Sequence, residues 1–317
     1  MYHYMAHDDT IIRKDVRSLS PNEKRKFVDA VKALKANTKD NKLGDNRYDD
    51  YVLWHAQTMM IPAGNDRAPR NLAHMGPIFL PWHREFLRRF ELDLRKEVPD
   101  VSIPYWNWPF DLTLPSPSES PVWQEDFMGG NGDPTNDNKV MFGPFRDWVT
   151  QEVDPGNGNP LPKNPQRDRL RRNFGNSFPR LPTQTDVYSA FSFEYYDTPY
   201  WDRLSRGFRN ALEGWPNGPQ LHNRVHVWVG GSMELSTSPN DPVFFLNHSN
   251  VDRIWAIWQE LRFDLGYPGD GAIIDRTCQR IAGFNLNDKI RPWENEEGSK
   301  TIADVLNHRQ LGYTYTK

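Results

Sequence analysis

The chain has 317 residues, a formal net charge of −3 and a single cysteine. This length allows one large domain or two ordinary ones. The small negative charge gives no indication that nucleic acid or an anionic membrane surface is a partner. One cysteine excludes a disulfide within the chain, and it excludes zinc or iron–sulfur sites built from several cysteines.

The N-terminal segment and the hydropathy pattern bear on location. The sequence has no run of about 18 apolar residues, so we expect no membrane span. The segment MYHYMAHDDTIIRKDV lacks the apolar stretch of a secretory signal, and we therefore expect a cytoplasmic protein. Residues 1–12 are predicted to form a flexible N-terminal arm, and residues 13–317 are predicted to form one domain.

Three segments with helical spacing of apolar residues predict helices in the first hundred residues. Before the first of them, Ser20 can form a capping box with Glu23, and Pro21 suits the first helical position. The second predicted helix covers residues 48–60 and contains His55. The third covers residues 81–97 and contains His83.

The middle of the chain has a different composition. Thirteen of the 26 prolines fall between residues 104 and 182, which predicts long irregular loops, and such loops are often functional. Helices are predicted again at 202–214, around 222–226, and at 251–265. The expected fold class is therefore mainly α, in a single domain with loop-rich connections.

Two of the nine histidines, His222 and His226, are four residues apart. In a helix such residues share one face, with Cβ atoms about 5–6 Å apart, so both can reach one ion. The zinc-protease motif needs Glu after the first histidine, whereas Asn223 follows here. The pair by itself is weak evidence, because His3 and His7 have the same spacing in a polar segment without a further ligand.

The sequence around this pair strengthens the prediction of a metal site. His248 follows 22 residues after His226 and supplies a third imidazole, while His55, His74 and His83 form a second set of three. Two triads made only of histidine predict a pair of metal sites. Imidazole without carboxylate or thiolate suits copper, with zinc as the alternative.

Several windows carry a resemblance to a known family. They include IPYWNW, GPIFLPWHREF, FRNALEGWPNGPQLHNRVHVWVGG, NDPVFFLNHSNVDRIW and the terminal LGYTY. They resemble the tyrosinase family, and its compact bacterial members in particular, from about Ile12 to Tyr315. The resemblance implies a four-helix bundle around a coupled type-3 dicopper centre that uses O2 as co-substrate. It assigns the first copper ion to His55, His74 and His83, and the second to His222, His226 and His248.

The resemblance also implies an activity: hydroxylation of monophenols to o-diphenols and oxidation of these to o-quinones. In tyrosinases the removal of the phenol proton is attributed to a water held by Glu and Asn, and Glu213 and Asn223 occupy the matching positions. A carboxylate facing the metal ions could polarise such a water into a base. The alternatives are an enzyme limited to diphenols or o-aminophenols, an O2 carrier, and a zinc or structural site.

Residues expected to shape the mouth of the site are Val227, Pro219, Phe244, Met233 and Ser236. Val227 follows the second ligand of the second triad, where some bacterial relatives carry Arg. Without that cation the binding of a carboxylated substrate is weaker, so we expect the preferred substrates to be smaller or less charged phenols. The sequence is compatible with a homodimer and with a copper-delivery protein as partners.

Three further features of the sequence bear on the family pattern. Asn247 precedes His248 where many relatives have a second histidine, so a contact behind the ligand is expected to differ. Leu72 stands two residues before His74, and no thioether link to a histidine is expected. Tyr313 and Tyr315 resemble the family's tyrosine motif, for which Arg13 is the expected partner.

Overall fold

The structure is a computed structural model that describes residues 10–216, 220–262 and 266–316. His3, His7 and Pro219 lie outside the described residues. The helices are α1 (Pro21–Ala36), α2 (Arg47–Met59), α3 (Phe79–Glu97), α4 (Trp108–Asp111), α5 (Gln184–Phe191), α6 (Phe208–Glu213), α7 (Leu221–Val229), α8 (Val243–Arg262) and α9 (Ile302–Val305). The strands are β1 (Ile11–Arg13), β2 (Gly132–Asp133), β3 (Lys139–Val140) and β4 (Tyr313–Tyr315).

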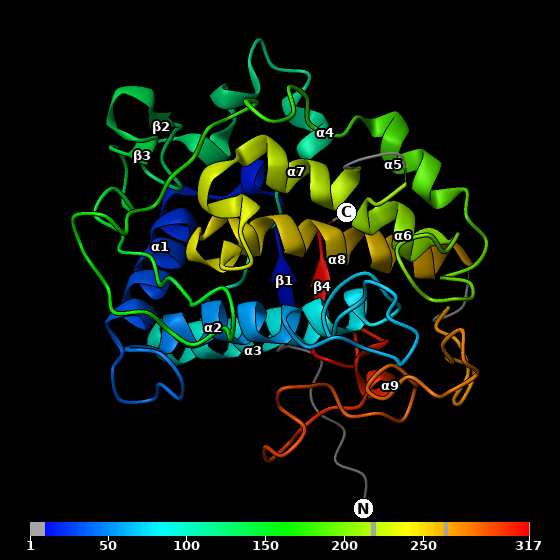
Figure 1. Cartoon of the computed structure of the whole chain (residues 1–317). Helices are drawn as coiled ribbons and strands as arrows, with labels where there is room; N and C mark the ends of the chain where they lie inside the picture. Colours follow the sequence, from blue (N-terminus) through cyan, green and yellow to red (C-terminus); the bar gives the residue numbers. More distant parts are fainter. Residues whose placement is uncertain (1–9, 217–219, 263–265, 317) are drawn as a thin grey trace, which may run out of the picture.

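Four helices form the framework of the molecule. Figure 1 shows α2 and α3 running side by side, with α7 and α8 on the other side of the bundle. Helix α3 packs against α8, α7 packs against α8, and α1 covers α2 and α3 from outside. This mainly helical architecture confirms the predicted fold class. None of the described helices combines the length and apolarity needed to cross a membrane.

The predicted helix boundaries hold best where the sequence carries a capping signal. Helix α1 begins at Pro21, and Ser20 and Glu23 form the expected capping box. Helices α2 and α3 contain His55 and His83 as predicted, although α3 begins at Phe79, two residues before its expected start.

Two other boundaries were predicted wrongly. The helix expected at 202–214 is α6 and begins only at Phe208. The backbone before it turns at Gly207, which has a φ of 155° and where a Cβ would lie 2.7 Å from Asp197 Cα. Helix α8 begins at Val243 rather than at residue 251, so His248 lies within it. Helix α5, for which no helix was predicted, begins with a capping box of Thr183 and Asp186.

The expected N-terminal arm also needs a correction at its end. Residues 1–9 lie outside the described residues, but Ile11 and Ile12 belong to β1. This strand pairs in parallel with β4, which places the two distant ends of the domain side by side. Backbone pairing with the C-terminal strand therefore orders residues that the polar composition alone suggested were loose.

A buried charge cluster locks this pair of strands onto the bundle. Arg13 is fully buried and forms an ion pair with Glu91 of α3 at 2.8 Å. Its guanidinium also donates a hydrogen bond to the Tyr315 hydroxyl at 3.1 Å and lies over the Tyr313 ring. These contacts confirm the predicted partnership of Arg13 with the two tyrosines.

Asp252 of α8 is the acceptor at the centre of the same cluster. It receives Arg84 at 2.5 Å and the Tyr313 hydroxyl at 2.6 Å. Burial acts to raise the pKa of Asp252, but Arg84 and Arg13 outweigh it and hold this pKa below its usual value. The carboxylate thus ties α8, which carries His248, to α3, which carries His83.

We expect Asp252→Asn to lower the free energy of unfolding by about 3–5 kcal/mol, because it leaves buried arginines without their counter-charge. Urea unfolding of the metal-free protein measures this change. Asp126→Asn is the matched control, since Asp126 is exposed and forms an ion pair with Lys24 at the surface. A loss no larger than that of the control would contradict the role given to the cluster.

Candidate metal centre

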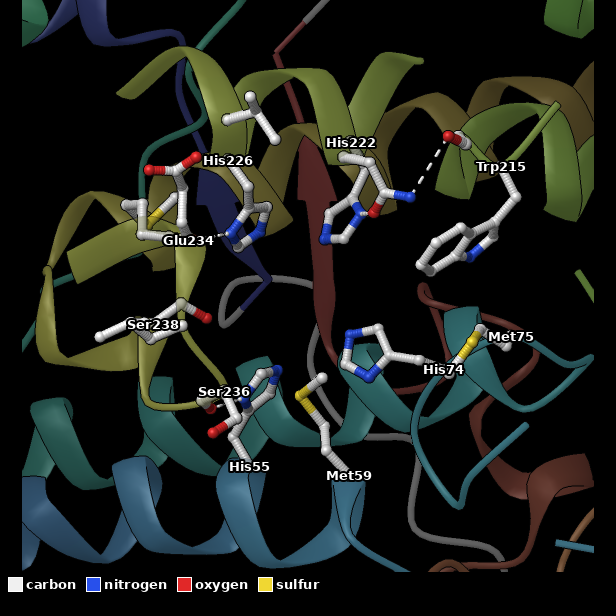
Figure 2. Close-up of a pocket in the computed structure, with 15 residues that line it drawn as sticks. His55, Met59, His74, Met75, Trp215, His222, His226, Glu234, Ser236 and Ser238 are labelled. Atoms are coloured by element: carbon white, nitrogen blue, oxygen red, sulfur yellow. Dashed lines mark hydrogen bonds between the residues drawn. The ribbon is translucent and has the colours of Figure 1, made fainter. Parts of the chain in front are cut away.

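Six histidines from four helices and one loop meet in the middle of the bundle. His55 comes from α2, His83 from α3, and His74 from the loop between them. His222 and His226 come from successive turns of α7, and His248 from α8. Figure 2 shows His55 and His74 facing His222 and His226 across a common space. The structure thus brings together all six predicted ligands.

The ligand atoms form two compact groups. His55, His74 and His83 form one group, and the other histidines form the second; within each group the candidate ligand atoms lie within 4.8 Å of one another. The two groups face each other: the rings of His83 and His248 stack with centroids 4.3 Å apart and planes 12° apart.

Most of these rings are oriented by a hydrogen bond at Nδ1. The Nδ1 atom of His55 lies 2.6 Å from the Ser236 carbonyl oxygen, that of His83 lies 2.8 Å from Phe79 O, and that of His226 lies 2.7 Å from Met233 O. A carbonyl oxygen accepts only, so each Nδ1 carries the proton and Nε2 keeps its lone pair. Tying the other ring nitrogen in this way is typical of metal ligands.

The free lone pairs point at one another. His248 Nε2 lies 3.2 Å from His222 Nε2 and 3.4 Å from His226 Nε2. Bonds of about 2.0–2.1 Å to a tetrahedral ion separate two ligands by about 3.3 Å. In the first triad, the Nε2 atoms of His55 and His83 are buried and lack a hydrogen-bond partner among the described residues. Both sets therefore fit a metal ion of the size of copper or zinc.

Burial keeps the imidazoles neutral, which a metal ligand requires. Removal from water lowers the pKa of His55 to about 3 and that of His226 to about 4. The same cause lowers the pKa of His74, His222 and His248 well below the ordinary value. No carboxylate stands among the six ligands, so the donor set is the one that suits copper.

The two triads open into a cavity of about 480 Å³. Its wall is mostly apolar or weakly polar. The lining residues are His55, Met59, His74, Met75, Gly214, Trp215, His222, Asn223, His226, Val227, Met233, Glu234, Leu235, Ser236 and Ser238. A cavity of this size and character is typical of a small-molecule site.

Only some of the residues expected at the mouth of the site line the cavity. Val227, Met233 and Ser236 all line the cavity. Phe244 does not: it is completely buried, and its ring stacks on His248 with centroids 4.1 Å apart. Phe244 lies in the first turn of α8, which was expected to begin only at residue 251, and the helix directs this side chain into the core behind the ligands. Pro219 lies outside the described residues.

Asn223 and Glu213 lie at the edge of the second triad. Asn223 lines the cavity, and its Oδ1 lies 3.0 Å from His222 Nδ1 while its Nδ2 donates to Gly214 O at 3.2 Å. Glu213 is fully buried just behind this wall, and its main-chain oxygen lies 3.3 Å from His222 Nδ1.

The carboxylate of Glu213 is held from two sides. It accepts the Met75 N–H at 2.7 Å and the Arg209 guanidinium at 2.8 Å. Arg209, one helical turn earlier, also binds the buried carboxylate of Asp197. Burial raises the pKa of Glu213, and Arg209 opposes that rise. The contact with Met75 connects this group to the loop that carries His74.

Sequence reasoning missed Arg209 and Phe79. Arg209 lies four residues before Glu213, and this spacing could have suggested an ion pair across one turn. Phe79 packs its ring against His83 and His222, with centroids 4.8 and 4.9 Å apart, and so supports both triads. Apolar patterning could not separate it from ordinary core residues.

Two departures from the family pattern can now be placed. Asn247 is fully buried beside His248, and its amide group has no hydrogen-bond partner among the described residues. Cys278 is exposed on a loop outside both triads.

A helical bundle that brings two all-histidine triads face to face defines a binuclear metal protein. A family model described as the common central domain of tyrosinase matches residues 45–261. The tyrosinase of Streptomyces glaucescens is 39% identical over 302 residues, which cover 94% of this chain and 96% of that protein. Grixazone synthase of Streptomyces griseus subsp. griseus is 38% identical over 96% of this chain and 98% of its own.

A solved structure shows the same architecture. A mutant polyphenol oxidase from Thermothelomyces thermophila superposes with a TM-score of 0.74 at 26% identity, covering 98% of this chain and 90% of that one. The chain belongs to the tyrosinase family. It is a copper-dependent oxidoreductase with a type-3 dicopper centre that uses O2 as co-substrate.

Proposed function

We propose that this protein is a tyrosinase that hydroxylates monophenols to o-diphenols and oxidises these to o-quinones. The observation that carries the proposal is the pair of facing histidine triads beneath an accessible, largely apolar cavity. Ligands without carboxylate suit a metal that changes oxidation state, because neutral imidazoles serve both Cu(I) and Cu(II).

Each triad holds one copper ion in this proposal. His55, His74 and His83 bind the first, and His222, His226 and His248 bind the second. When bound, the copper pair supplies the redox chemistry by which O2 oxidises the phenol ring. The protein contributes rings held in one tautomer by carbonyl groups such as Ser236 O and Met233 O, and a surrounding core that keeps bulk water away.

In this proposal Glu213 receives the phenol proton through a water molecule, and Asn223 helps to hold that water by hydrogen bonding. Asn223 presents its amide in the cavity wall, directly after the ligand His222. Glu213 stands behind it, and a carboxylate can accept more hydrogen bonds than the two supplied by Met75 and Arg209. Its raised pKa makes it a stronger base than an exposed glutamate.

The alternative with the strongest support is an enzyme that oxidises only o-diphenols or o-aminophenols. Identity does not separate the two, because the chain is 39% identical to a tyrosinase and 38% identical to grixazone synthase. The two readings differ in whether the chain can remove the proton of a monophenol. Turnover of a monophenol therefore decides between them.

We expect copper-loaded protein to consume O2 with both 4-methylphenol and 4-methylcatechol. Glu213→Gln should slow monophenol hydroxylation about 100-fold, the lower end of the effect of a positioned base. It should leave diphenol oxidation much less affected, because a catechol binds and is oxidised with a smaller demand on that base. Initial rates with an oxygen electrode measure both reactions.

Glu194→Gln is the matched control, since Glu194 is exposed and does not line the cavity. Copper content is measured for each variant, because Glu213 also contacts the loop that carries His74. Equal losses of both activities at full copper content would contradict the role of Glu213. Turnover of the diphenol alone by the unmodified protein would favour the alternative enzyme.

We expect Val227→Arg to lower KM for acidic monophenols such as 3-(4-hydroxyphenyl)propionate by about two- to five-fold, since an exposed ion pair is worth up to about 1 kcal/mol. Val227 lines the cavity and is partly exposed, so an arginine there can reach a bound carboxylate. KM for 4-ethylphenol should stay unchanged. Val227→Leu controls for the added bulk, and an unaltered ratio of the two KM values in Val227→Arg would refute this role.

A further inference from the structure

The charges on the cavity wall are unevenly distributed. Among the described lining residues, Glu234 is the only carboxylate, and neither lysine nor arginine is present. The four lining histidines carry no charge, because they are buried candidate ligands. Val227 stands where an arginine would supply a cation, so the wall offers an anionic group and no partner for a carboxylate.

Glu234 occupies a well-defined place beside the second triad. It is the last residue of a short 3-10 helix, Gly231–Glu234, that directly follows α7. Its neighbour Met233 is buried, and the Met233 carbonyl accepts the hydrogen bond from His226 Nδ1 at 2.7 Å. The backbone at Glu234 is thereby anchored to a ligand, and Figure 2 shows Glu234 on the same side of the cavity as His226.

The carboxylate of Glu234 is free to meet a ligand. The side chain is exposed, and it forms no ion pair or hydrogen bond with any residue in the part of the chain that the structure describes. A structural carboxylate in this protein is normally paired, as Asp252 and Glu213 are. Glu234 differs from them in facing the cavity without a counter-charge.

We propose that Glu234 selects phenols with a cationic side chain, the hydroxyphenyl alkylamines, over phenols with a carboxylate. This inference rests on the proposed function, in which the phenol ring enters the cavity towards the two triads. The substituent opposite the hydroxyl then points back to the mouth. There an ammonium group meets the Glu234 carboxylate, whereas a carboxylate meets a like charge.

The size of the effect follows from the exposure of Glu234. Water and salt screen a pair at the mouth, so the selection is modest and weakens as ionic strength rises. Free tyrosine carries both an ammonium and a carboxylate group. Glu234 attracts the first and repels the second, so the two effects on binding oppose each other. The substrates that best reveal Glu234 therefore carry a single charge.

The test compares three monophenols of similar length: tyramine, 4-ethylphenol and 3-(4-hydroxyphenyl)propionate. We expect Glu234→Gln to lower the ratio of kcat/KM for tyramine to that for the propionate about two- to five-fold, and 4-ethylphenol to be unaffected. Raising the salt concentration should lower the same ratio in the unmodified protein. Glu297→Gln is the matched control, because Glu297 is exposed and lines a different hollow.

A binding measurement separates this inference from the proposed function. Zinc-loaded protein is titrated with tyramine and with the propionate, and Glu234→Gln should weaken tyramine binding by the same factor. If the copper form turns over none of the phenols, the proposed function fails, and the zinc form still decides the role of Glu234. The inference would be overturned if the ratio of kcat/KM for tyramine to that for the propionate were the same in Glu234→Gln as in the unmodified protein.

Discussion

The structure depends on burying six imidazole rings together without an acidic partner. Desolvation is the first cause of the lowered pKa of every one of them. Neutral rings in a low-dielectric core keep their lone pairs available. In His55, His83 and His226 the hydrogen bond from Nδ1 to a carbonyl oxygen leaves the lone pair on Nε2. This arrangement is costly unless a metal ion completes it, because the buried Nε2 atoms of His55 and His83 have no hydrogen-bond partner among the described residues.

One connection serves both metal sites. The segment between α7 and α8 supplies Ser236 O to His55 of the first triad and Met233 O to His226 of the second. The same segment forms part of the cavity wall and carries Glu234. Ligand orientation and the character of the mouth are thus coupled through a few residues. On the far side of the bundle, Asp252 joins α8 to α3, so the helices that carry His248 and His83 cannot drift apart.

The metal ligands could be predicted from the sequence because all six are histidines and because His222 and His226 have helical spacing. The start of α1 could be predicted because the capping box at Ser20 is a local signal that needs no tertiary contact. Prediction from the sequence failed where tertiary contacts decide. Phe244, expected at the mouth, lies in the core because α8 already begins at Val243. Ile11 and Ile12, expected in a flexible arm, form a strand because they pair with β4. Arg209 and Phe79 escaped notice because an arginine in a helix and a phenylalanine in an apolar stripe are common, and only the fold sets them beside Glu213 and the triads.

The most direct test of the central claim is to locate copper in crystals of the copper-loaded protein by anomalous scattering at the copper absorption edge. The six-histidine assignment predicts two peaks, each about 2.0–2.1 Å from imidazole nitrogens of one triad. In His226→Ala the peak at His222 and His248 should weaken strongly, while the peak at His55, His74 and His83 remains. A single peak in the unmodified protein, or peaks away from these rings, would contradict a dicopper centre built from the two triads.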